Sequence, residues 1–98
     1  MNRQEILQAA SKCVGADRPQ NYGNPENNFE KIADLWSDYL GYRIRATDVP
    51  AMMILLKIAR ISSSVAKEDN WVDIAGYAAC GGEIEWIDNM LKGVQDEG

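Results

Sequence analysis

The sequence contains no histidine, only two cysteines and no long apolar run. Without histidine, Ser-His-Asp and Cys-His catalysis are excluded, and a metal site would need carboxylates, which suit magnesium or manganese. Cys13 and Cys80 form no CxxC pair, so we expect reduced, mostly buried thiols. The longest apolar run, residues 49–56, is too short to cross a bilayer. With no basic or apolar leader, these features predict a soluble, cytoplasmic protein that does not enter a membrane.

Positive charge is also scarce, and the net charge is -5. This balance argues against a binder of long nucleic acid, whose affinity would come from clustered lysine and arginine. Any nucleotide that the protein handles is therefore expected to be small. The 98 residues predict one domain, residues 1–98. An apolar content of 46% with three tryptophans exceeds what one small core needs, which favours a homo-oligomer.

Apolar residues recur at helical spacing along the whole chain. The pattern predicts an all-α, small four-helix bundle-like domain, with helices at about 3–14, 25–41, 48–64 and 69–92. One buried face is expected in the second helix, made by Phe29, Ile32, Trp36, Tyr39 and Leu40.

The third and fourth helices have unusual compositions. From residue 49 to residue 61 only Lys57 and Arg60 interrupt the apolar residues, which is typical of a helix in the middle of a bundle or between subunits. The fourth helix carries several small residues, and its glycines indicate close approach of another helix or of a ligand, with helix crossing favoured. Thr47 and Asp69 are the expected N-caps of these two helices.

Four charged residues are expected to share one site. Asp73 lies in register with the apolar row that continues through Tyr77, so it should point inward. Lys57 and Arg60 are one turn apart on an otherwise apolar helix, so they should point inward or into a crevice. Because a short connection makes the third and fourth helices antiparallel neighbours, the cations should lie beside Asp69 and Asp73.

Two interpretations of this charged site stay open. The four charges can simply pair with one another and set the helix register. Alternatively, Lys57 and Arg60 hold a phosphate, with the start of the fourth helix and Arg18 nearby. Tyr22 would then stack on a base, although a single loop tyrosine is more often a structural anchor.

Three segments carry a family resemblance: NYGNPENNF (21–29), MMILLKIARI (52–61) and DNWVDIAGYAACG (69–81). They resemble a family of small uncharacterised proteins of phages and prophages, over most of residues 1–85. The chain is also similar, more remotely, to the nucleotide-modification-associated domain and to the all-α MazG-type nucleoside triphosphate pyrophosphohydrolases.

The MazG-like resemblance implies an oligomeric helical bundle that holds a nucleotide and magnesium between helices. In that family two acidic pairs on successive helices bind the metal. Asp73 matches the last aspartate, but Asn70 stands at its partner position, and Lys57 and Arg60 stand where the first pair would fall. Two cations there would repel the ion. Asp69, Asp73, Glu30 and Asp34 are the metal ligands only if the chain is an enzyme.

Three functions follow as hypotheses. The first is a phage-type homo-oligomer that binds a small phosphorylated nucleotide through Lys57, Arg60, Arg18, Tyr22 and Asp73, and that sequesters it or presents it to a partner. The second is a divergent, magnesium-dependent nucleoside triphosphate pyrophosphohydrolase. The third is a structural or protein-interaction oligomer with exposed aromatics such as Trp71 and Trp86.

Overall fold

Four α-helices build the protein in the computed structural model, which describes residues 1–14, 25–63 and 67–93, without the side chains of residues 25–27. The helices are α1 (Arg3–Val14), α2 (Pro25–Leu40), α3 (Asp48–Ser62) and α4 (Glu68–Leu91). No strand occurs in these described ranges. The prediction of an all-α fold with four helices is therefore confirmed.

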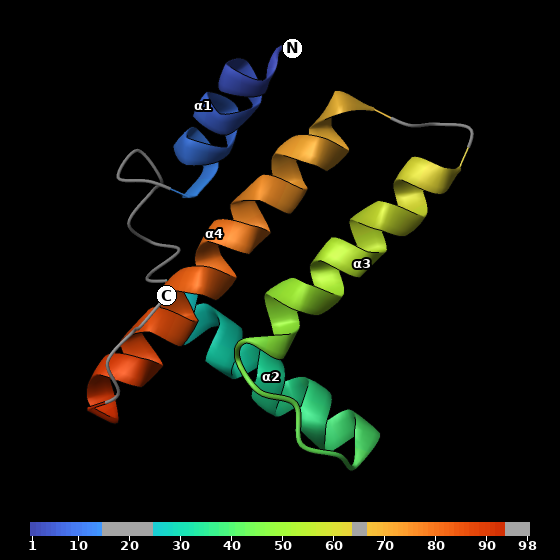
Figure 1. Cartoon of the computed structure of the whole chain (residues 1–98). Helices are drawn as coiled ribbons and strands as arrows, with labels where there is room; N and C mark the ends of the chain where they lie inside the picture. The colour runs from blue at the N-terminus through green and yellow to red at the C-terminus, as the bar shows by residue number, and fades with distance from the viewer. Residues whose placement is uncertain (15–24, 64–66, 94–98) are drawn as a thin grey trace.

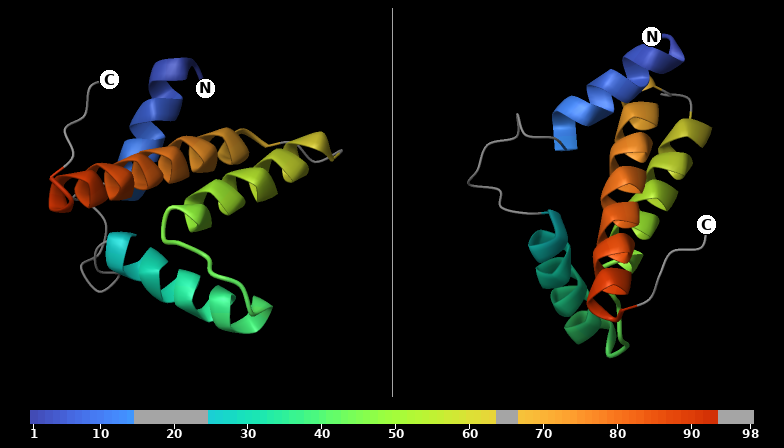
Figure 2. Two further views of the ribbon diagram at one scale, coloured as in Figure 1. Left: turned by 60° about the horizontal axis from the view of Figure 1, so that its bottom comes forward. Right: turned by 60° about the vertical axis from the view of Figure 1, so that its left-hand side comes forward.

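The helices α3 and α4 lie side by side and antiparallel, and the other two helices pack against this pair (Figure 1). The helix α1 lies parallel to the first half of α4. Met1 contacts Glu68 at one end of this pair, and Val14 lies against Gly76 at the other. Pairing with Glu68 raises the pKa of the Met1 amino group above its ordinary value. The helix α2 crosses below the pair and contacts both α3 and α4 (Figure 2).

Two glycines of α4 mark the places where neighbouring helices approach closely. A Cβ atom at Gly81 would lie 3.2 Å from Cγ of Pro50 at the start of α3. At Gly76 the same atom would lie 3.4 Å from a methyl group of Val14. The expectation that small residues allow helix crossing is confirmed at these two positions.

The core lies where α2, α4 and the start of α3 meet. Its buried members share one apolar cluster: Phe29, Ala33, Ile44, Val49, Cys80 and Ile84. Only the first part of the predicted α2 face enters this cluster. Tyr39 is 90% exposed and Leu40 is 55% exposed, so the prediction was wrong for the end of α2, which none of the other described helices covers.

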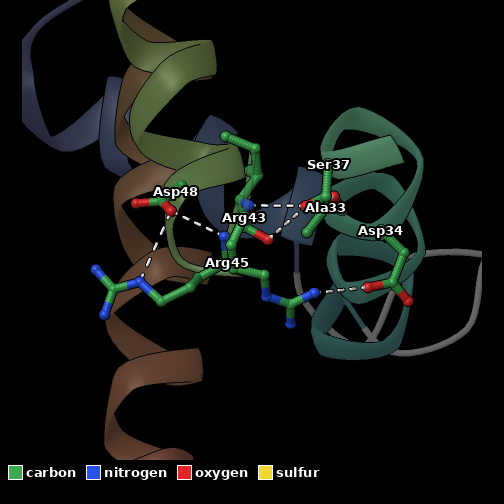
Figure 3. Close-up of polar contacts among 7 residues, drawn as sticks. Ala33, Asp34, Ser37, Arg43, Arg45 and Asp48 are labelled. Atoms are coloured by element: carbon green, nitrogen blue, oxygen red, sulfur yellow. Dashed lines mark hydrogen bonds and ion pairs between the residues drawn. The ribbon is translucent and has the colours of Figure 1, made fainter. Parts of the chain in front are cut away.

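The Ser37 hydroxyl group links the end of α2 to the connection that leads to α3. Gly41 ends α2 with a positive φ of 66°, which a residue without Cβ adopts easily. The Ser37 Oγ then accepts a hydrogen bond from the Ile44 amide at 2.7 Å (Figure 3). Its own proton can be donated to the carbonyl of Ala33, at 2.7 Å, or to that of Ile44, at 3.2 Å. Ile44 is thereby fixed in the core.

We expect Ser37→Ala to lower the free energy of unfolding by about 1–2 kcal/mol, because the half-buried Ile44 amide loses its acceptor. Urea denaturation followed by circular dichroism measures this change. The matched control is Ser62→Ala on α3, where an exposed hydroxyl only donates to the Ile58 carbonyl. Equal effects of the two substitutions would contradict the role given to Ser37.

The N-termini of α3 and α4 differ from the predicted caps. Lys67, not Asp69, occupies the N-cap position of α4, and Asp69 lies in the first turn. Thr47 does occupy the N-cap of α3, but its side chain makes no capping hydrogen bond. The local polar contact is made instead by Asp48, which accepts a hydrogen bond from the Arg45 amide at 2.8 Å (Figure 3). Acidic side chains still lie in both first turns, where their negative charge interacts favourably with the positive end of the helix dipole.

None of the helices in the described part of the chain combines the length and the apolar content that crossing a bilayer requires.

Candidate functional site

A cavity of about 260 Å³ lies among the four helices and is the candidate site. Each helix contributes to its wall: Cys13 and Val14 from the end of α1; Asn28, Phe29, Ile32 and Trp36 from α2; Val49 and Met53 from α3; and Val72, Asp73, Gly76, Tyr77 and Cys80 from α4. Most of these side chains are apolar or aromatic. Pockets for small organic ligands have this character, with a few polar groups that orient the ligand.

Aromatic rings form a large part of the wall. The rings of Phe29 and Tyr77 are tilted by 44° with their centroids 6.4 Å apart. Trp36 adds a third ring from the next turns of α2. Such surfaces offer flat apolar contact to a planar group, and the tyrosine hydroxyl adds a polar end.

The charged residue on the wall is Asp73. One of its carboxylate oxygens, Oδ2, lies 2.9 Å from Nζ of Lys57 on α3. The lysine side chain is 16% exposed and the aspartate side chain is 37% exposed. An ionised carboxylate accepts several hydrogen bonds, so Asp73 can bind Lys57 and still accept a hydrogen bond from a group in the cavity.

The other two predicted members of the charged site lie on the surface. Arg60 and Asp69 are both exposed, so of the two placements expected for Arg60, inward or in a crevice, the inward one was wrong. Helical spacing places Arg60 on the same side of α3 as Val49 and Met53, so its exposure does not come from the face it occupies. Arg60 lies in the last turn of α3, where a long side chain can extend into solvent.

The proposed metal ligands on α2 are also on the surface. Glu30 and Asp34 are both exposed, and Asp34 forms an ion pair with Arg43 at 3.3 Å (Figure 3). Asp69 is exposed and Asp73 is paired with Lys57. Within the described ranges, no three side chains of the types Asp, Glu, Cys or His form a group able to hold a metal ion.

Arg18 and Tyr22 lie outside the described residues, in the segment 15–24. This segment joins α1 to α2, and both of these helices contribute residues to the wall of the cavity. Their roles stay predictions made from the sequence.

Sequence reasoning missed several residues of the wall. Asn28 was not singled out, and Met53 was seen only as part of an apolar run. Cys13 was expected only as a mostly buried thiol, but it is exposed, whereas Cys80 is buried as expected. Phe29 and Trp36 were predicted as core, and Tyr77 as a member of the row of Asp73. The spacing of these residues along one helix indicated that they are buried. It could not indicate a cavity, because a cavity depends on how all four helices pack.

The fold and the site define a small all-α protein with a ligand-sized cavity, whose described lining is mostly apolar and includes the carboxylate of Asp73. The model of DUF6378, a domain of unknown function, matches residues 5–85, and the chain belongs to this family.

Two relatives are proteins of mycobacteriophages. The Gene 55 protein of Mycobacterium phage D29 is 43% identical over 77 residues, which are 79% of this chain and 51% of the relative. The Gene 55 protein of Mycobacterium phage L5 is 46% identical over 74 residues, which are 74% of this chain and 47% of the relative. The chain thus spans about half the length of these relatives. No solved structure matches it.

These comparisons confirm the resemblance to a family of phage proteins. The more remote resemblance to MazG-type enzymes stays a prediction.

Proposed function

We propose that the protein binds a small phosphorylated nucleotide, with the base in the cavity and a phosphate near Lys57. The observation that supports this proposal is Asp73, which lies on the cavity wall and is paired with Lys57 at 2.9 Å. A protein of this kind would sequester a signalling nucleotide in the cytoplasm or present it to a partner, and it would act as a homo-oligomer.

The lining favours the base as the group inside the cavity. Its described residues include aromatic rings and a carboxylate but no lysine or arginine. A planar base matches the rings of Phe29, Trp36 and Tyr77, and its N–H groups match the acceptor on Asp73. A phosphate inside would instead face a carboxylate in apolar surroundings, which is unfavourable.

The phosphate is expected to bind outside the cavity. Lys57 has three N–H donors, and the contact with Asp73 engages one of them. Asp73 would therefore orient the ammonium group as well as bind the base. Arg60 is exposed on the same helix and would add a second positive charge.

Isothermal titration against a panel of nucleoside mono-, di- and triphosphates and cyclic dinucleotides tests the proposal. We expect wild type to bind at least one of them. Lys57→Met should weaken this binding by about tenfold or more, because it removes one charge-assisted hydrogen bond, whose free energy corresponds to that change in affinity. The control is Lys31→Met, which removes an exposed lysine from α2.

Absence of binding by wild type to every nucleotide would overturn the proposal, and so would equal affinities of the two lysine variants. Magnesium-dependent release of pyrophosphate, lost in Asp73→Ala, would instead identify the chain as a pyrophosphohydrolase.

A second candidate function is a protein-interaction module. It is favoured by two large aromatic side chains on α4, since Trp71 is 52% exposed and Trp86 is 56% exposed. Tryptophans of this kind often provide the main binding energy of an interface. This function predicts that replacing both Lys57 and Asp73 by apolar residues leaves partner binding intact.

A further inference from the structure

The outward face of α3 is apolar although none of the four described helices covers it. Its large side chains are Met52, Leu55, Leu56 and Ile58, which are 39%, 64%, 49% and 48% exposed. The opposite side of α3 packs inward through residues such as Met53 and Lys57. This helix therefore has two apolar sides, and only one of them is buried.

The exposed residues form a continuous seam. Met52, Leu55, Leu56 and Ala59 follow one another at spacings of three, one and three residues, which is the pattern of a helix that packs against another helix. Ala59 is exposed as well. We call these four residues the α3 seam.

We propose that the α3 seam binds the α3 seam of a second copy of this chain, with the two helices antiparallel. The proposal specifies the contact surface of the homo-oligomer in the proposed function, but it does not depend on nucleotide binding. Its basis is that the seam is complementary to itself.

Shape is the first part of this complementarity. A twofold axis between Leu55 and Leu56 places Met52 of one copy opposite Ala59 of the other, and Ala59 of the first opposite Met52 of the second. A large side chain then meets a small one on both sides of a leucine centre. Alternation of large and small residues is what lets two helices pack without voids.

Charge is the second part. The seam itself carries no charge, so pairing buries no like charges. The antiparallel arrangement brings the end of α3 that carries Arg60 beside the start of the other α3, where Asp48 lies. Opposite charges and opposite helix dipoles thus come together at both ends of the contact.

The area is at the low end for a dimer. Met52, Leu55 and Leu56 of the seam, with Ile58 beside Leu55, expose on the order of 350 Å² of apolar surface per copy, which is the size of the largest patch on a typical monomer. With Ala59 and the Arg60 stem, two copies would remove less than about 1,000 Å² from water, which is the size of a weak, concentration-dependent interface.

Sedimentation analysis without nucleotide, over about a hundredfold range of micromolar concentration, tests the proposal. We expect wild type to have twice the mass of one chain, and Leu55→Glu to have the mass of one chain with unchanged helical circular dichroism. The control is Leu7→Glu, which alters a leucine of α1 that is 63% exposed and should leave the dimer intact. A monomeric wild type, or a dimeric Leu55→Glu, would overturn the proposal.

Cysteine cross-linking in a Cys13→Ser background tests the antiparallel arrangement. A disulfide needs Cα atoms within about 7 Å of each other. Mixing the variants Met52→Cys and Ala59→Cys should therefore give more covalent dimer than either variant alone. More dimer from Met52→Cys alone would overturn the antiparallel arrangement. Neither experiment involves a ligand, so a failed nucleotide titration leaves both results interpretable.

Discussion

Replacing Asp73 by leucine is expected to lower the free energy of unfolding by about 2 kcal/mol, whereas replacing Lys57 by methionine should cost less than about 1 kcal/mol. The difference follows from burial. Loss of Asp73 leaves the ammonium of a side chain that is only 16% exposed without its partner, while loss of Lys57 leaves a carboxylate that is 37% exposed. Urea denaturation of both variants at one protein concentration measures the two values.

The double variant Lys57→Met with Asp73→Leu should be close to wild type in stability, because neither buried charge is left unpaired. A coupling of about 2–3 kcal/mol between the two changes is expected from this cycle, because the double variant lacks the sum of the two single losses. The control is Asp34→Leu, which breaks the exposed pair with Arg43 and should change stability by less than about 0.5 kcal/mol. Additive effects of the two single changes would show that Lys57 and Asp73 do not stabilise one another.

The same double variant separates structure from function. If the pair only sets the register of α3 and α4, the variant retains every activity of the protein. If the pair serves a ligand, the variant folds but no longer binds it, because both the acceptor on the cavity wall and the cation beside it are gone.

The largest loss of stability is expected for Ile84→Ala, at about 3 kcal/mol. Ile84 is 2% exposed and lies in the core cluster with Phe29, Val49 and Cys80. Truncation removes buried methyl and methylene groups and leaves a void that the three packed helices cannot close. For a chain of this size the melting temperature should fall by more than about 10 °C.

Leu91→Ala provides the matched control, since this leucine is 80% exposed at the end of the same helix. It should change the stability by less than about 0.5 kcal/mol. A small effect at Ile84 together with a large effect at Leu91 would mean that the core lies elsewhere on α4.

Helical periodicity was enough to predict all four helices, because the spacing of apolar residues is a property of each segment alone. The antiparallel pairing of α3 and α4 also followed from the sequence, since two helices joined by a short connection usually pack as antiparallel neighbours. From that pairing came the contact between Lys57 and Asp73, which the structure shows at 2.9 Å.

Other predictions failed at the ends of helices. Arg60 was expected inward or in a crevice because its neighbours are apolar, yet it is exposed, since it lies in the last turn of α3, where its long side chain can reach solvent. Tyr39 and Leu40 continue the apolar face of α2, but that helix crosses the others and its end extends past them.

The sequence by itself determined the all-helical character, the acidic balance and the lysine and aspartate that meet between two helices. These depend on local spacing and on short connections. Only the tertiary structure decided that a cavity lies among the four helices, that Asp73 lies on its wall, and that one side of α3 is left uncovered. The reason is that a cavity and an exposed face both depend on how distant segments pack, and periodicity within one helix carries no information about the crossing of another.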